Sequence, residues 1–319
     1  NEADWQGQWI GLDRTTPGDS ETQWSRLAAR YLRKEFALSK EVKRATVHID
    51  GMGLYELFIN GQRIGDQVLA PAPTDYRKTI LYNTYDVTPQ LRKENAIGVT
   101  LGNGRFYTMR QNYKPYKIPT FGYPKLRLNL IVEYMDGSKE TIATNTSWKL
   151  TTEGAIRSNN EYDGEEYDAR KELGNWTQSG YDDKSWIAAQ RVSIPSGTLR
   201  AQIMPGMKVM DTLKPVSIQK LGDKYILDFG QNMAGWMRFR IKGQAGDSIR
   251  LRFAETLQAN GELYTRNLRD ARSTDTYIVS GREVKDTTWA PRFVYHGFRY
   301  VEVSNYPDAQ LGDFVAEVV

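Results

Sequence analysis

Apolar and polar residues alternate with a period of two along most of the chain. The segments 126–134, 237–242 and 249–253 each place an apolar residue at every second position, with mainly charged or amide side chains between them. A period of two is typical of a β-strand that buries one face and leaves the other in water. The pattern therefore predicts many short, half-buried strands.

Turn sequences separate these strands. Asn60-Gly61, Asp136-Gly137 and Asn260-Gly261 each lie between two alternating segments, and these dipeptides accept the positive φ angles of tight hairpin turns. The only helix candidates are short, for example residues 183–189. We therefore predict an all-β fold made of two antiparallel β-sandwich (jelly-roll-like) domains.

The length of the chain favours two domains. Its 319 residues exceed the usual size of one domain. Residues 192–213 contain Pro and Ser and lack clean alternation, so they are the best boundary. We predict a first domain at 1–195 and a second at 196–319.

Composition excludes several classes of function. The net charge is only +4 and the basic residues are not clustered, so a nucleic-acid-binding arm is not expected. The absence of Cys excludes disulfides, thiolate zinc sites and a cysteine nucleophile. No apolar run is long enough to span a membrane. The chain begins with Asn1, and we expect a processed protein whose export signal has been removed.

Histidine chemistry and phosphate binding find little support. His48 lies within an alternating strand segment, and His296 lies among aromatic residues, so structural roles are favoured for both. No glycine-rich phosphate loop occurs, and no two His residues stand at the spacing of metal ligands.

The segment NEYDGEEYDAR, residues 160–170, holds the densest group of carboxylates: Glu161, Asp163, Glu165, Glu166 and Asp168. Catalysis by a carboxyl pair requires burial or a close like charge to raise one pKa. The flanking Arg157 and Arg170 and the internal Gly164 instead indicate an exposed loop or strand edge. A structural role is favoured, with a cation or ligand contact and catalysis as alternatives.

Residues 101–124 combine aromatic rings with polar side chains between two predicted strands. Aromatic faces can stack on sugar rings, while amides and guanidiniums bind the hydroxyls. Long loops of this kind are often functional. Packing of these rings on their own sandwich is an equally good interpretation. The segment contains the following candidates: Phe106, Tyr107, Tyr113, Tyr116, Phe121, Tyr123, Asn103, Arg105, Arg110 and Asn112.

Several long motifs occur in the order found in one enzyme family. The run GLYELFINGQRIGDQVLAPAPTDYRKTILYNTYDVTPQLRKENAIGVTLGNGRFY, the segment YDGEEYDAR, the run LDFGQNMAGWMRFRIKGQAGDSIRLRFAETLQANGELYT and the run TDTYIVSGREVKDTTWAPRFVYHGFRYVEV resemble bacterial α-L-rhamnosidases of glycoside hydrolase family 78. The match extends from about residue 31 to residue 303. The resemblance covers the N-terminal β-sandwich modules of that family.

The resemblance implies an inverting glycosidase that releases terminal α-L-rhamnose. Its catalytic carboxylates would lie in an (α/α)6 barrel that follows these β-domains, so no catalytic residue is expected in this chain. The first domain would resemble a carbohydrate-binding module, and the second would pack on the barrel. The implied partner is an L-rhamnose-containing glycan, and the implied location is periplasmic or secreted.

Some modules of this family resemble calcium-assisted rhamnose-binding modules. The matching positions here give seven candidates for sugar contacts: Asp75, Tyr76, Asn103, Arg105, Tyr107, Asn112 and Tyr113. Asp75 is also the candidate for a Ca²⁺ contact, and calcium prefers several oxygen ligands. Asp163, Glu165 and Asp168 form a secondary acidic cluster that matches a family motif.

Two departures from the family pattern affect these assignments. Arg105 stands where the family often has Trp, which puts a stacking platform in doubt, and Ala72 stands where it usually has Gly. In the second domain, a set of aromatic and histidine residues is expected to form core or interdomain packing, with Arg299 or His296 facing a catalytic domain as the alternative. The set is Trp236, Trp289, Phe293, His296, Phe298 and Tyr300.

Two other functions remain open from the sequence. One is a self-sufficient glycoside hydrolase that uses the acidic segment 160–170. The other is a structural module that binds no ligand.

Overall fold

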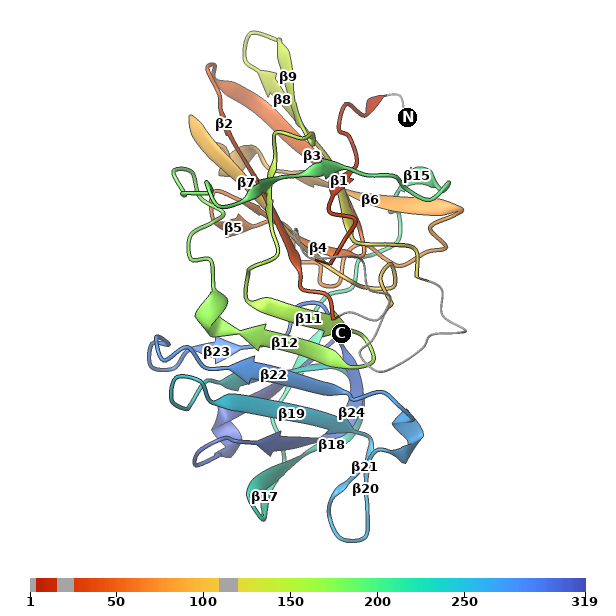
Figure 1. The fold of residues 1–319 in the computed structure, drawn as a ribbon, viewed down its shortest axis with the longest axis vertical. Coiled ribbons are helices and arrows are strands. Elements are labelled where there is room, and N and C mark those ends of the chain that lie inside the picture. Colours follow the sequence, from red (N-terminus) through yellow and green to blue (C-terminus); the bar gives the residue numbers. More distant parts are fainter. Residues whose placement is uncertain (1–3, 16–25, 109–119) are drawn as a thin grey trace. The chain divides into compact units, whose positions relative to one another are not determined.

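The computed structural model describes residues 4–15, 26–108 and 120–319. Its chain forms two compact units, drawn in Figure 1. The first unit contains Asn1–Gly154 and Leu173–Met207, and the second contains Ala155–Glu172 and Lys208–Val319. The segment 155–172 therefore leaves the first unit and joins the second.

The first unit contains a seven-stranded and a six-stranded sheet. Their strand orders are β14-β1-β8-β3-β6-β15, with β9 paired to β8, and β13-β10-β2-β7-β4-β5. The first sheet consists of β1 (Ile10–Gly11), β3 (Val42–Met52), β6 (Thr79–Asp86), β8 (Lys125–Tyr134), β9 (Lys139–Ala143), β14 (Gln190–Arg191) and β15 (Thr198–Ala201). The second consists of β2 (Arg30–Ala37), β4 (Leu54–Ile59), β5 (Gln62–Arg63), β7 (Glu94–Gly102), β10 (Lys149–Thr151) and β13 (Ile187–Ala188).

The core of this unit lies between the two sheets. Val47 on β3 and Leu130 on β8 belong to the same buried cluster as Leu57 on β4 and Val99 on β7. The cluster also contains Trp148, which is fully buried. Burying one such aliphatic side chain contributes about 1.5–3 kcal/mol, so the burial of these side chains stabilises the packing of the two sheets.

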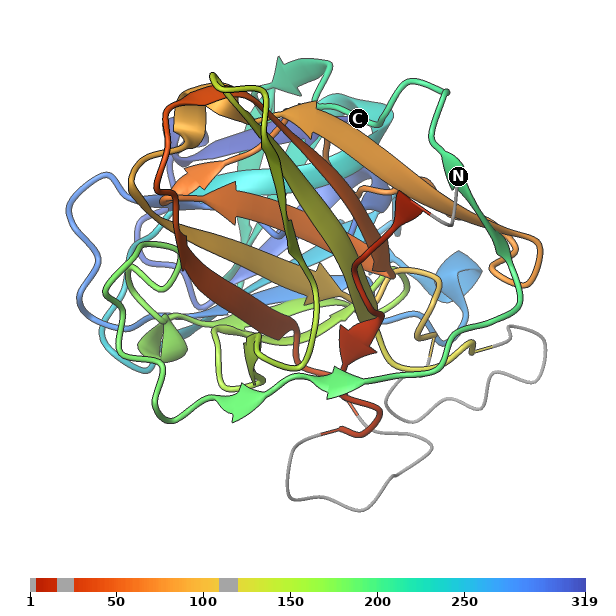
Figure 2. The same ribbon diagram turned by 90° about the horizontal axis from the view of Figure 1, so that it is seen from above.

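The segment that returns from the second unit runs along the edge of the first. β13 pairs with β10, β14 pairs with β1, and β15 pairs in parallel with β6. Figure 2 shows this segment in green, passing the red β1 and then lying beside the orange β6. It supplies the strands at both ends of the order of the first sheet and the strand at one end of the second.

The second unit contains a ten-stranded sheet in the order β11-β12-β22-β19-β24-β18-β25-β16, with β17 and β23 also paired to β18. A two-stranded ribbon, β20 (Thr256–Leu257) and β21 (Leu263–Tyr264), accompanies it. The strands of the large sheet are β11 (Ile156–Asn160), β12 (Gly164–Asp168), β16 (Asp211–Leu213), β17 (Ser217–Leu221), β18 (Lys224–Arg240), β19 (Ser248–Ala254), β22 (Thr274–Ile278), β23 (Thr288–Trp289), β24 (His296–Ser304) and β25 (Phe314–Val318).

The sheet of the second unit folds over its own core. β18 is interrupted by a bulge between Asp228 and Met233 and changes its neighbours along its length. Phe239 on β18 and Tyr277 on β22 have ring centroids 6.1 Å apart, although two strands separate β18 from β22 in the sheet order. In a flat sheet these strands would be about 14 Å apart. Their contact shows that the sheet curls so that β18 and β22 face each other across a buried layer.

The helical elements are short 3-10 turns: η2 (Thr88–Gln90), η3 (Ala169–Lys171), η4 (Arg266–Leu268) and η5 (Leu311–Asp313). Within the described part of the chain there is no α-helix, and none of the helices could cross a lipid bilayer. The predicted all-β class is confirmed. Most strand pairs are antiparallel, and β15 with β6 and β12 with β22 are parallel.

The strands and hairpins predicted from the period of two are confirmed. Segments 126–134, 237–242 and 249–253 overlap β8, β18 and β19. Asn60 and Gly61 both have positive φ angles, 50° and 83°, as a two-residue hairpin turn requires. The short helix suggested for residues 183–189 is wrong. A single turn, in which Trp186 N–H donates to the Asp183 carbonyl, is followed by β13, because Ile187 and Ala188 pair with β10.

The compact units divide the chain differently from the predicted domains 1–195 and 196–319. The first unit extends to Met207, and residues 155–172 belong to the second. The reason is backbone pairing: Glu166, Tyr167 and Asp168 of β12 pair with Thr276, Tyr277 and Ile278 of β22. No local pattern in the sequence reveals this long-range pairing.

Candidate functional site

The acidic segment 160–170 forms the turn and second strand of the β11–β12 hairpin. Asn160 pairs with Gly164 across the turn. Gly164 has a φ of +99°, and a Cβ atom there would lie 2.1 Å from the Thr274 carbonyl oxygen. Only glycine lets β12 approach β22 this closely. The segment is thus an integral part of the sheet and not a free loop.

Glu165 is buried at the centre of this arrangement. Its side chain is only 1% exposed, and its carboxylate accepts hydrogen bonds from the Arg292 N–H (3.2 Å) and the Phe293 N–H (3.0 Å). Burial, and then the nearby Asp275 carboxylate, raise the pKa of Glu165 to about 8, although the two backbone donors act in the opposite direction. Glu165 can therefore hold a proton at neutral pH.

Asp275 and His296 complete a buried network with Glu165. His296 Nε2 lies 3.0 Å from Asp275 Oδ1, and that oxygen also accepts the Glu165 backbone N–H at 2.9 Å. The imidazole stacks on Phe253 with ring centroids 4.1 Å apart, and its Nδ1 lies 3.3 Å from the Ser273 hydroxyl. Asp275 and His296 are 0% and 4% exposed. These three groups are therefore nearly or fully inaccessible from the surface, and the network joins β12, β22 and β24.

The other acidic side chains of the segment have separate partners. Asp168 is buried, caps η3 by accepting the Arg170 N–H, and binds the Arg170 guanidinium with two bonds of 2.8 Å. The hydrogen bonds from Arg170 lower the pKa of Asp168. Asp163 is partly exposed, and its carboxylate accepts the Arg272 N–H at 3.4 Å. The predicted exposure of this segment is wrong for Glu165 and Asp168, because strand pairing with β22 buries them.

Both histidines occupy structural positions. His48 on β3 lies 2.9 Å from the Thr84 hydroxyl through Nδ1, and its ring packs edge-on against Trp5 and Tyr82. Partial burial lowers the pKa of His48. The aromatic residues predicted as core in the second domain are buried, except for the half-buried Tyr300, which lies under the Arg299 guanidinium. Arg299 forms a bidentate ion pair with Asp228, with bonds of 2.8 and 2.9 Å.

Two of the predicted sugar contacts are buried aromatic rings. Tyr76 is 3% exposed and packs against Phe106 and Phe121 with ring centroids 5.0 and 5.2 Å away. Tyr107 is also 3% exposed and stacks on Tyr123 at 5.3 Å. Neither ring presents a free face to a sugar in this structure. Their described neighbours favour the packing interpretation of this loop.

The remaining predicted contacts are spread over different environments. Asn103 is buried and Arg105 is exposed, whereas Asn112 and Tyr113 lie outside the described residues. Asp75 binds the Arg77 guanidinium at 3.0 Å, and this bond lowers its pKa. Across residues 4–15, 26–108 and 120–319, no group of three or more His, Asp or Glu side chains is placed to hold a metal ion.

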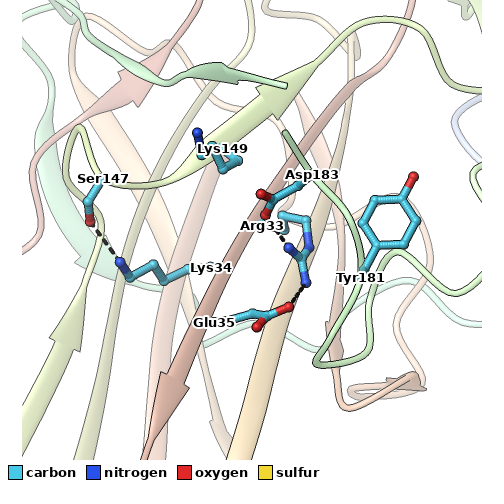
Figure 3. A pocket seen from close by; sticks show the side chains of 7 residues that line it. All are labelled: Arg33, Lys34, Glu35, Ser147, Lys149, Tyr181 and Asp183. Atoms are coloured by element: carbon cyan, nitrogen blue, oxygen red, sulfur yellow. Dashed lines mark hydrogen bonds and ion pairs between the residues drawn. The ribbon is translucent and has the colours of Figure 1, made fainter. Parts of the chain in front are cut away.

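A cleft of about 260 Å³ lies on the first unit, between β2, β10 and residues 181–183. We call it the Arg33 pocket; its lining residues, drawn in Figure 3, are Arg33, Lys34, Glu35, Ser147, Lys149, Tyr181 and Asp183. No local pattern in the sequence indicates this pocket, because Arg33 and Asp183 on its two walls are 150 residues apart in the chain.

Arg33 holds the wall of this pocket in place. Its side chain is 1% exposed and forms ion pairs with Glu35 and Asp183. It also donates to the Trp176 carbonyl (2.9 Å) and the Gln178 carbonyl (3.0 Å). A guanidinium offers five donors in a planar fork, which suits four simultaneous acceptors. Arg33 thus attaches the segment 173–183 to β2.

Two domain families match the chain. Residues 40–211 match the α-L-rhamnosidase N-terminal domain, and residues 219–319 match the bacterial α-L-rhamnosidase concanavalin-like domain. An α-L-rhamnosidase of Streptomyces avermitilis is 40% identical over 302 residues, which cover 89% of this chain and 28% of that protein.

Solved structures show the same similarity. The structure of an α-L-rhamnosidase from Dictyoglumus thermophilum superposes with a TM-score of 0.89 at 40% identity, covering 100% of this chain and 36% of that one. The crystal structure of the Streptomyces avermitilis enzyme, complexed with L-rhamnose, gives 0.84 at 38% identity over 91% of this chain and 28% of that one. The chain thus spans about a third of the length of the relatives it matches.

The N-terminal domain match alone covers more than half of the chain, and the second match extends from residue 219 to residue 319. The chain belongs to the α-L-rhamnosidase family, as its N-terminal and concanavalin-like β-domains.

Proposed function

We propose that this chain is the accessory β-portion of a longer α-L-rhamnosidase that hydrolyses terminal α-L-rhamnose with inversion. In this proposal the acid and base of the reaction belong to an (α/α)6 domain outside these 319 residues. The first unit contacts the saccharide, and the second provides a docking surface for the catalytic domain. The protein acts in the periplasm or outside the cell.

The burial of the acidic network carries this proposal. Glycoside hydrolysis requires two carboxyl groups that face the scissile bond, one of them with a raised pKa. Glu165 has the raised pKa, but Glu165, Asp275 and His296 are nearly or fully inaccessible. Asp168 is held by Arg170 and Asp75 by Arg77. The densest carboxylate cluster of the chain is thus suited to stabilise the fold.

The names of the relatives support the rhamnose part of the proposal. Proteins called α-L-rhamnosidase share 34–40% identity with this chain over about 300 residues. One related enzyme was crystallised with L-rhamnose. Because the chain spans about a third of these proteins, the activity is proposed for the longer protein.

Hydrolysis of p-nitrophenyl α-L-rhamnoside tests whether the catalytic groups lie outside this chain. The purified chain is expected to show no turnover, whereas a protein extended by the rest of its reading frame is expected to be active. Turnover by the chain alone that disappears in folded Glu165→Gln would establish the self-sufficient hydrolase instead.

Calorimetry with L-rhamnose tests the sugar contact. A binding heat is expected, and a parallel titration with Ca²⁺ present shows whether the cation contributes. The absence of heat in both titrations would favour the structural module without ligand.

A further inference from the structure

The Arg33 pocket carries two kinds of positive charge. The Arg33 guanidinium already binds two carboxylates and two carbonyls within the fold. Lys34 Nζ, by contrast, donates only to the Ser147 hydroxyl, at 2.9 Å. Among the described residues, Lys149 Nζ has no hydrogen-bond or ion-pair partner. The pocket thus offers two ammonium groups that no carboxylate of the described chain neutralises.

The two lysines supply positive charge for an anionic group of a ligand. Lys149 is paired with Arg33 across β10 and β2, so both residues occupy neighbouring positions of one sheet. Figure 3 shows the Lys34 and Lys149 side chains on the Ser147 side of the Arg33 guanidinium, with Tyr181 on the other side. Three positive and two negative side chains line the pocket, which leaves it with a net positive charge.

The carboxylates of the pocket favour hydroxyl groups in the same ligand. Glu35 and Asp183 are fixed by Arg33, and their side chains are 40% and 24% exposed. Ionised carboxylates only accept hydrogen bonds, so they bind hydroxyl donors and repel a simple anion. The Tyr181 hydroxyl adds a donor and acceptor, while its ring is covered by the Arg33 guanidinium at 5.2 Å. A ligand with one carboxylate and several hydroxyls satisfies both sets of groups.

The size of the cleft agrees with one sugar unit. Its volume of about 260 Å³ lies just below the roughly 300–1,000 Å³ of pockets for drug-sized ligands. We propose that the Arg33 pocket binds an acidic monosaccharide unit, a uronate, whose carboxylate contacts Lys34 and Lys149 and whose hydroxyls contact Glu35 and Asp183. The choice of a glycan as the source of that unit rests on the proposed function.

Binding of D-glucuronate, D-glucose and acetate to the 319-residue chain tests the proposal. Glucose has the hydroxyls without the carboxylate, and acetate has the carboxylate without the hydroxyls. Titrations at low ionic strength are expected to give a glucuronate affinity at least about tenfold above that of either control ligand, since hydrogen bonds to charged groups contribute roughly a factor of ten or more.

Charge-removing variants locate the site. Lys149→Gln and Lys34→Gln are each expected to weaken glucuronate binding about tenfold. Lys139→Gln is the matched control, because Lys139 is 65% exposed on β9 of the other sheet, and it is expected to change nothing. Thermal melting confirms that all three variants are folded.

Three results would overturn the proposal. They are equal affinities for glucuronate and glucose, equal affinities for glucuronate and acetate, and equal effects of Lys139→Gln and Lys149→Gln. These outcomes are independent of the rhamnoside assay. Turnover by the chain alone would contradict the proposed function while leaving a lysine-dependent glucuronate site intact.

Discussion

The buried Glu165 carboxyl predicts a specific dependence of stability on pH. Its pKa is about 8 in the folded chain and near 4.5 when unfolded. Because the folded value is the higher one, the stabilising contribution is fully present below pH 4.5 and is lost as the pH rises toward 8. Each unit of pKa difference corresponds to about 1.4 kcal/mol, so the second unit should lose about 3 kcal/mol between pH 5 and pH 8 through this group.

The variant Glu165→Gln isolates this contribution. The amide cannot ionise, and it retains an oxygen for the Arg292 and Phe293 N–H groups. Urea unfolding of both proteins at half-unit steps from pH 5 to pH 8, followed by tryptophan fluorescence, gives the free energy of unfolding for each. Subtracting one from the other cancels titration of groups that do not interact with Glu165.

The difference between the two proteins should change in favour of the variant by about 3 kcal/mol as the pH rises across this range. The Asp275 carboxylate raises the pKa of Glu165, so Asp275→Asn serves as a second comparison in which Glu165 loses its charged neighbour. The reasoning is refuted if parent and Glu165→Gln lose stability in parallel at every pH.

Three further predictions concern stability and can be measured by urea or thermal unfolding. Arg33→Ala should lower the free energy of unfolding by about 3 kcal/mol because it leaves buried carbonyls and two carboxylates without their partner. The control Lys184→Ala, at a side chain that is 91% exposed, should change it by no more than about 0.5 kcal/mol. Similar losses in both variants would contradict this prediction. Gly164→Ala should lower the free energy of unfolding by about 4 kcal/mol, since its Cβ would clash with the neighbouring strand β22. Gly137→Ala meets no atom within 4 Å and should lower it by about 1 kcal/mol because of its positive φ alone. The reverse order would disprove the close approach of β12 to β22. Tyr107→Ala should cost about 3 kcal/mol because the ring is buried against its aromatic neighbour, and a fully stable variant would show that the ring is not part of the core.

The sequence was sufficient to predict the strands and turns that depend only on neighbouring residues. The period of two in segments 126–134 and 249–253 corresponds to β8 and β19, and Asn60-Gly61 forms the expected hairpin turn. These features depend on neighbouring residues only, because side-chain alternation and positive φ angles are properties of a short stretch.

The environment of the acidic segment could not be read from its own residues. Glu165 looked solvated because arginines and further acids surround it in the chain. Its burial depends on Asp275 and on the backbone of Arg292 and Phe293, which lie more than 100 residues away. A carboxylate at a buried strand position has no compositional signature until its partner strand is known.

The candidate binding residues divide in the same way. Tyr76 and Tyr107 have the chemistry of a sugar platform, but the sequence does not tell which face of an aromatic ring will be covered. The Arg33 pocket requires Asp183 to return to β2 from 150 positions away. Only the fold brings these charges together.

The exchange of segment 155–172 between the units has a consequence for proteolysis. The chain crosses from one unit to the other at 154/155, 172/173 and 207/208. A single nick between residues 172 and 173 would give two fragments, each of which supplies strands to both units. Neither piece could diffuse away without tearing strands from the sheets, so the nicked protein would behave as one particle under native conditions and separate only in denaturant.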